Sequence, residues 1–310
     1  MTEIVGPENV KVYFDTEDTY GDGGSAGLPD FSWLGIVQEP AQAMDNNLSE
    51  CRGIGDIDIN SLRPGMVAPD LDIKYIIQKY KAGGCAYGDW DPATFLKYAT
   101  TFPTGLGLEW LASFGATPTI ISLWYKGFLV DSLEIDFTAD SFVTASVKLL
   151  GQNIAVGTAA VGNSYEDNPL DLANSNCLPL TGFDAEVFMN ATGAVDVPLT
   201  NVKSVKLSVN NHLARIPVIR SATPTLLKYI QRTKRELTGE IVVFMESSSE
   251  YKDLVDMTDL DIRVDLDSSQ NRPYFDFSHC TLDKGSIGTR INEFPCDVVL
   301  PFKAVSLTIG

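Results

Sequence analysis

Alternation of apolar and polar residues over short runs constrains this chain more than any other feature of its sequence. Residues 131–137 read Asp-Ser-Leu-Glu-Ile-Asp-Phe, with an apolar side chain at every second position from the third onward. A period of two is typical of a half-buried β-strand. After a polar break at 138–141, residues 142–150 alternate in the same way. Two such runs joined by a short polar break predict a β-hairpin.

The same pattern recurs along most of the chain, so we expect a mainly β fold. Further strands are predicted at 10–16, 69–79, 124–130, 202–211, 235–246, 260–266, 274–277 and 296–309. Gly239 indicates a bulge or a close approach, and Pro301 a bulge or an edge in the last strand. One or two short helices are expected. One spans 91–99, with Asp91 at the N-cap and Pro92 at the first helical position, and the other 248–255.

Two stretches have no clear period and are expected to form long loops. Residues 15–30 are rich in Gly and Asp, and residues 153–200 mix Gly, Asn, Pro and small side chains. A structureless loop of that length is unusual in a compact domain unless it has a function or becomes ordered against a partner.

The charge balance argues against nucleic-acid binding. The 310 residues include 41 acidic and 23 basic side chains, for a net charge of −18. Binding to phosphates needs clustered cations, and so does attraction to an anionic membrane surface. Solubility, or a host with an acidic proteome, would also explain the acidity. No signal peptide and no apolar run of about 18 residues is seen, so a soluble cytosolic product without membrane insertion is expected.

No catalytic, cofactor or metal site is predicted. The five cysteines are scattered without a CxxC pair, so neither a disulfide framework nor a zinc site is indicated. His279 adjoins Cys280, but neighbouring residues of a strand point to opposite faces. Residues 56–60 begin like a calcium loop, yet its sixth and twelfth positions hold Ser61 and Val67 in place of Gly and Glu. An enzyme is therefore not expected.

Several segments, taken in order, resemble the tail tube proteins of long-tailed phages and archaeal viruses. They are residues 12–21, 33–37, 53–65, 72–75, the hairpin 133–151, 205–213 and 235–244. Residues 12–21 resemble the family's first strand and the acidic segment after it, which here ends in Tyr20-Gly21. Residues 81–118 and 153–200 have no counterpart, and insertions or extended loops are expected there within a single domain, 1–310.

The resemblance implies a β-sandwich or half-barrel subunit whose sheet joins those of its neighbours into a closed β-barrel. Hexameric rings would stack into a hollow virion tail tube through which the genome passes without specific binding. A tape-measure protein and tail-end ring proteins would be further partners. Loops 15–30 and 214–234 would become ordered on assembly.

The resemblance also assigns candidate surfaces. The candidate lumen-facing acids are Glu134, Asp136, Glu236 and Glu240. Lys148, Lys203 and Lys206 lie on the same kind of face, and the sequence leaves open which face looks inward. The candidate inter-ring loop is basic and without acids, and its cations are Arg215, Arg220, Lys228, Arg232 and Lys234.

Two alternatives stay open at this point. One is another ring protein of a tail or injection machine, such as a tail terminator, a baseplate component or a contractile-tail inner tube. The other is a carbohydrate-binding β-sandwich, although the tryptophans of this chain are too scattered to form an aromatic binding face.

Overall fold

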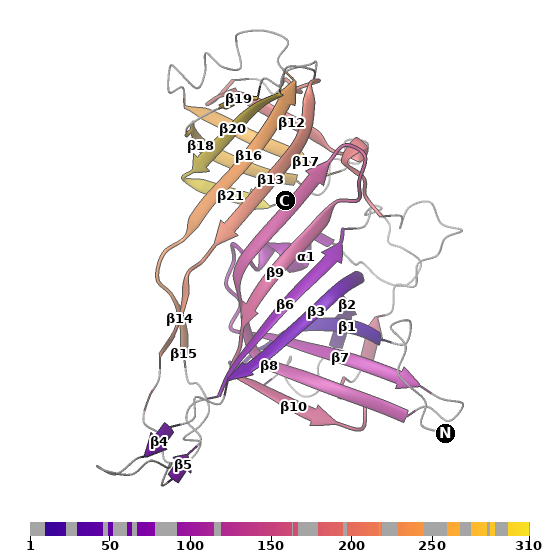
Figure 1. Ribbon diagram of the computed structural model, residues 1–310. Helices are drawn as coiled ribbons and strands as arrows, with labels where there is room; N and C mark the ends of the chain where they lie inside the picture. The colour runs from indigo at the N-terminus through magenta and orange to yellow at the C-terminus, as the bar shows by residue number, and fades with distance from the viewer. Residues whose placement is uncertain are drawn as a thin grey trace.

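The computed structural model describes most of the chain as β-strands (Figure 1). The described residues are 10–22, 30–45, 49–51, 61–63, 67–77, 92–114, 119–162, 164–166, 179–194, 197–216, 218, 229–244, 259–266, 274–283, 286–288 and 297–309. The strands are β1 (Val10–Thr16), β2 (Asp30–Trp33), β3 (Ile36–Asp45), β4 (Ser49–Cys51), β5 (Ser61–Arg63), β6 (Ala68–Ile76), β7 (Leu106–Phe114), β8 (Thr119–Thr138), β9 (Thr144–Leu150), β10 (Asn153–Gly157), β11 (Ser164–Glu166), β12 (Glu186–Ala191), β13 (Val202–Asn210), β14 (Leu213–Ile216), β15 (Tyr229–Arg232), β16 (Glu236–Phe244), β17 (Leu260–Asp265), β18 (Tyr274–Leu282), β19 (Ser286–Gly288), β20 (Asp297–Ala304) and β21 (Ser306–Ile309). Helix α1 (Pro92–Lys97) and a 3₁₀ turn, η2 (Gly182–Asp184), complete the elements.

One long antiparallel sheet dominates the molecule. Its strands follow the order β3-β6-β9-β8-β13-β16-β20, and each pairs with the next. The predicted hairpin is confirmed as β8–β9, in which Asp136 lies opposite Thr144. Alternation gives this sheet two unlike faces. Side chains such as Ile135, Leu207 and Ile241 are buried in the core, while the side chains that alternate with them along each strand face solvent.

Two smaller groups of strands cover the apolar face. Strands β1, β2, β7, β10 and β11 gather around the first half of β8, and β12, β17, β18 and β21 lie behind β16 and β20 (Figure 1). Phe277 of β18 meets Phe302 of β20 with ring centroids 5.5 Å apart. Helix α1 fills the space between layers, because Phe95 contacts Phe14 of β1 and Tyr75 of β6. The layers form a sandwich with one continuous core.

Strand β8 belongs to both layers. Over its 20 residues it pairs first with β7 and β10, and then with β9 and β13. Gly127 lies at the change of partners with φ +66°, a conformation that glycine adopts without steric cost. An added Cβ there would also lie 2.9 Å from the Cβ of Gln152. The turn that moves β8 from one sheet to the other therefore depends on this glycine.

A buried carboxylate fixes that turn. Glu17, at the end of β1, is 3% exposed, and its Oε1 accepts the N–H of Gly127 at 2.8 Å. Its Oε2 accepts the N–H of Gly21 at 2.8 Å. The Tyr20 ring packs beside Gly127, and burial raises the pKa of its hydroxyl. One side chain thus satisfies two backbone donors from distant parts of the chain.

Some predicted elements need correction. The helix predicted at 91–99 is confirmed as α1. Residues 106–114 form β7, and residues 153–200 contain β10, β11 and β12, so long loops without regular structure were the wrong expectation for these described parts. The alternation of β7 is disguised because both of its faces are covered, as buried Leu108 and Glu109 show. The last strand divides at Val305 into β20 and β21.

Pro301 lies inside β20, opposite Glu240 of β16, and neither at an edge nor at a bulge of that pairing. Its carbonyl accepts from the N–H of Asp283 at 2.7 Å, so the missing N–H faces away from β16. The predicted N-cap Asp91 and the helix at 248–255 lie outside the described residues.

We expect Glu17→Ala to lower the free energy of unfolding by about 2–4 kcal/mol, because two N–H donors would lose their acceptor in a buried site. Chemical denaturation followed by tryptophan fluorescence measures this. The exposed Glu240→Ala is the control and should change stability by less than about 0.5 kcal/mol. A loss from Glu17→Ala no larger than that of the control would contradict the assigned role.

Candidate assembly surfaces

The solvent face of the long sheet carries a mixed set of charges. Pairing register and exposure place them on one face, and they are Asp72, Lys74, Glu134, Asp136, Lys148, Lys206, Glu236, Glu240 and Lys303. We call this set the charged face. All four predicted lumen acids belong to it, as do Lys148 and Lys206. Lys203 instead forms an ion pair with Asp297 at 2.7 Å.

Acids and lysines alternate across the strands of the charged face. Lys206 on β13 lies between Asp136 on β8 and Glu240 on β16 in register. Its Nζ also lies 3.2 Å from Glu134 Oε2. The pKa of Lys206 is raised, first by the hydrogen bond to Glu134 and then by the charges of Asp136 and Glu240. Exposed pairs of this kind add little stability, about 0–1 kcal/mol each, so their main effect is on the potential of the surface.

A two-stranded arm extends beyond the long sheet. β14 and β15 pair with each other, and Figure 1 shows them continuing from the lower ends of β13 and β16. The predicted basic loop is thus a β-hairpin in its described part. The strand predicted at 202–211 is confirmed as β13, which ends at Asn210.

The base of the arm is fixed by buried and partly buried hydrogen bonds. The Nδ2 of Asn211 donates to the carbonyls of Ala99 and Val130, at 2.9 and 3.0 Å, and its Oδ1 accepts from Arg235 at 3.1 Å. The N–H of Leu213 donates to Asp131 Oδ1 at 2.8 Å. The sequence does not predict these anchoring roles, because an Asn pair is typical of a turn but does not indicate which groups its amides contact.

The predicted inter-ring cations have different surroundings. Arg215 pairs with Asp70 of β6 and donates to the carbonyl of Pro69 at 2.8 Å. Arg232 lies over the ring of Phe102, with its Cζ 5.0 Å from the centroid. Lys234 pairs with Glu236. Arg220 and Lys228 lie outside the described residues. At least Arg215 therefore positions the arm within its own subunit.

Glu236 joins the charged face to the base of the arm. Its two carboxylate oxygens lie 2.9 Å from Lys234 Nζ and 3.0 Å from His212 Nε2. The hydrogen bond from Lys234, followed by that from His212, lowers the pKa of Glu236 to about 2. Of the four predicted lumen acids, this one is held by two partners.

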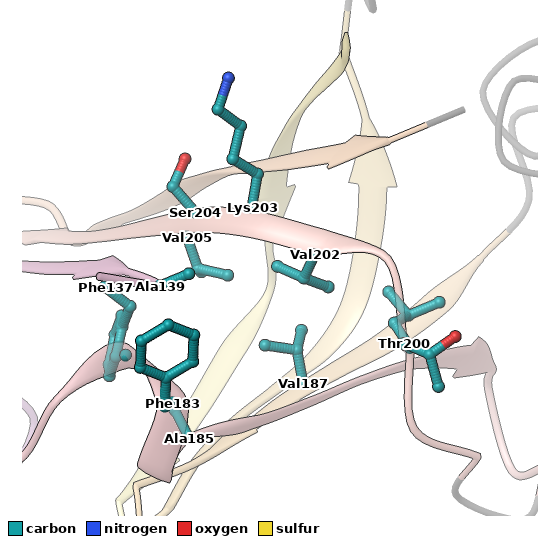
Figure 2. Close-up of a pocket in the computed structure, with 12 residues that line it drawn as sticks. Phe137, Ala139, Phe183, Ala185, Val187, Thr200, Val202, Lys203, Ser204 and Val205 are labelled. Atoms are coloured by element: carbon teal, nitrogen blue, oxygen red, sulfur yellow. The ribbon is translucent and has the colours of Figure 1, made fainter. Parts of the chain in front are cut away.

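A pocket of about 310 Å³, whose lining residues are mostly apolar, opens at the other end of β13. Figure 2 shows Phe183 and Val187 facing Val202 and Val205 across it, while Lys203 points away. Phe183, in η2, is 77% exposed. The sequence does not predict this pocket, because half of its lining lies in the stretch 153–200 taken for a loop and the other half lies near Phe137 and at 202–205. The alternation of apolar and acidic residues at 183–187 was its one local signal.

The His279–Cys280 pair lacks the geometry of a nucleophile and its base. The Cys280 thiol is buried, donates to the carbonyl of Phe277 at 3.3 Å, and has its pKa raised to about 12 by burial. The His279 ring instead pairs with Asp259 at 2.9 Å, and this hydrogen bond raises its pKa. Among the described residues no group of His, Cys, Asp and Glu side chains is suited to a metal ion. The described helical residues include no helix that could cross a membrane.

Comparisons with known proteins point to one family. A family model described as phage tail tube protein matches residues 9–292. A search of the curated proteins found no match. Among solved structures, the tail of an empty GTA particle with C6 symmetry matches at 9% identity and a TM-score of 0.35, over 42% of this chain and 98% of that one. The SPP1 tail tube matches at 13% identity and a TM-score of 0.39, over 55% and 86%. At these TM-scores the likeness is too weak to assign an assembly.

Replacing Lys234 or His212 with Ala should raise the pKa of Glu236 from about 2 toward its ordinary value near 4.5. Because the folded-state pKa is depressed, the stability that this carboxylate contributes is present above about pH 4.5 and is lost as the pH falls toward 2. Carboxyl-carbon NMR titration measures both values. Lys303→Ala, on the same sheet face, is the control and should leave the Glu236 titration unchanged. A normal pKa in the unmodified protein would contradict the arrangement.

Proposed function

The chain belongs to the phage tail tube protein family, whose model covers residues 9–292, and on this premise we propose that six copies form a ring and that rings stack into a conduit for the viral genome. Membership makes it a structural protein of the virion tail and not an enzyme. It also favours the tail tube over the carbohydrate-binding alternative. The ring, its size and its passive transport role are our proposal.

The long sheet, with one face in the core and one charged face in solvent, carries the proposal. Such a sheet can line a channel, because its buried face is already covered by the second layer. In the described part of the chain, β3 pairs only with β6, which leaves its outer edge without a strand. An uncovered edge of 10 residues is a template for another strand. Pairing this edge with a neighbouring copy would extend the sheet around a ring and complete a barrel.

We assign the charged face to the lumen because of how its charges are mixed. The lysines stand beside acids: Lys206 lies among Glu134, Asp136 and Glu240. Tight binding of DNA needs clustered cations that release counterions, and an interleaved face offers none. Its charges are screened beyond about 10 Å at 0.1 M salt, so the repulsion and attraction felt by DNA along the wall nearly cancel.

Further partners follow from the same role. A tape-measure protein would occupy the lumen during assembly, and other ring proteins would cap the two ends of the tube. Both would contact surfaces that ring stacking leaves open at the tube ends.

The purified protein should form hollow tubes with sixfold symmetry when concentrated. Electron cryomicroscopy of these tubes should place Glu134 and Asp136 at the inner wall. Particles that remain monomeric at every concentration tested would refute the proposed assembly. Tubes whose inner wall is made by another face would refute the assignment of the lumen alone.

Reversing two lumen charges with Glu134→Lys and Asp136→Lys should slow or stall DNA passage, because Lys206 would then stand in a cluster of cations. Ejection from virions that carry the variant, followed by DNA release over time, measures this. The control reverses two acids near the end of β1, Asp18→Lys and Asp22→Lys, with the same change in net charge. Equal ejection rates for both variants, with tubes intact, would overturn the lumen assignment.

A further inference from the structure

The two ends of β13 carry unlike surfaces. Val202 at its start lines the apolar pocket, and Asn210 at its end leads directly into the arm β14–β15. A strand of 9 residues extends over roughly 30 Å at about 3.3 Å per residue. Figure 1 shows the same polarity, with the arm below the long sheet and the start of β13 at its upper end. The pocket of a subunit is therefore beyond the reach of its own arm.

The pocket has an exposed apolar surface without a described cover. Phe183 is 77% exposed and Phe142, at the neighbouring β8–β9 turn, is 52% exposed. The two are linked through Thr181, which forms a β-bridge with Phe142 and precedes η2. Large exposed aromatic side chains grouped around a pocket mark a surface that contacts another molecule.

Three acidic residues adjoin the lining of this pocket in the chain. Asp140 follows the lining residue Ala139, and Asp184 and Glu186 stand on either side of Ala185, another lining residue. The one lysine of the lining, Lys203, is engaged by Asp297. The lining residues are thus mostly apolar, and their neighbours in the chain are acidic.

The arm offers the complementary chemistry. The segment between its strands, 217–228, reads Pro-Val-Ile-Arg-Ser-Ala-Thr-Pro-Thr-Leu-Leu-Lys, which is apolar and basic and contains no acid. Tyr229, at the start of β15, is 49% exposed. Apolar and basic residues together match a pocket that is apolar and acidic, and opposite charges at the rim of an interface favour the correct partner.

We infer that the pocket lined by Phe183 receives the β14–β15 arm of a second copy of this chain, at the junction between successive rings. The inference rests on the proposed tube and deepens it by naming the two surfaces that meet. Because donor and acceptor lie at opposite ends of β13, the contact is heterologous and leaves a free arm and a free pocket after each step. It therefore propagates along one direction, as a tube requires.

A disulfide ladder tests this contact directly. A chain with Phe183→Cys and Tyr229→Cys is oxidised after assembly and run on a non-reducing gel. A disulfide needs Cα atoms within about 7 Å, so the two new thiols cannot close within one subunit, and each subunit can bridge to two others. We expect a ladder of covalent multimers.

Matched controls identify the surface. The first control is the pair Val156→Cys and Tyr229→Cys, because Val156 on β10 is as exposed as Phe183, at 77%. The second control is the unmodified protein, which carries only the native cysteines. Neither control should give a ladder. Tubes that form without a Phe183 ladder, or an equal ladder from the Val156 pair, would overturn the inference and leave the proposed tube standing. An unmodified protein that forms no tubes would overturn both.

A second variant measures the apolar contribution. Phe183→Asp should raise the protein concentration needed for tubes by at least about tenfold, since burying a Phe side chain is worth more than the 1.4 kcal/mol of a tenfold change. Turbidity and sedimentation give this concentration. Phe183 is exposed in the subunit, so folding should be unchanged by circular dichroism. A tube-forming concentration equal to that of Val156→Asp would contradict a role for the pocket.

Discussion

The hydrogen bonds of the Glu17 carboxylate are the interaction on which the architecture depends. They hold β8 at Gly127, where the strand leaves the layer of β7 and β10 and enters the long sheet. A strand that changes sheets forms the corner between two layers. Without a fixed corner, the β8–β9 hairpin and the strands that pair with it would lose their orientation relative to the second layer. A buried charge at this place costs desolvation, which the two backbone donors offset.

Beyond this corner, the alternation of apolar and charged residues determines the two faces of the long sheet. Along each strand the apolar side chains point into the core and the charged ones point to solvent. Alternate residues of the same strands therefore build the core and the face that could line a channel. A shift of one residue in any pairing would exchange the two faces. Asn211, Arg235 and Asp131 therefore matter beyond their own bonds, since they fix the register where the sheet continues into the arm.

The sequence was sufficient for the half-buried strands and insufficient for the other strands and for the arrangement of the sheet. Period-two runs predicted β8, β9, β13, β16 and β17, because half-buried strands display their pattern openly. β7 escaped because both of its faces are covered, and the buried Glu109 breaks its apolar series while bonding to Ser122. The alternation pattern predicted that the candidate lumen acids face solvent. It could not predict which lysines lie beside them, because those lysines belong to other strands and are placed there by the pairing register. The pocket at Phe183 joins residues more than 60 positions apart in the chain, such as Phe137 and Val205, and no local pattern reports that.

The polarity of β13 links these surfaces into one consequence for assembly. A sheet that closes laterally through its β3 edge consumes that edge. Growth along the axis must use other surfaces, and they must differ at the two ends of the subunit, because identical ends would pair into a closed dimer of rings. A pocket with mostly apolar lining residues and acidic neighbours at one end of β13, and an apolar and basic arm at the other, would satisfy this requirement under the proposed assembly. In this scheme lateral closure depends on backbone pairing between strands, and axial growth depends on side-chain contacts. A substitution could therefore change one without changing the other.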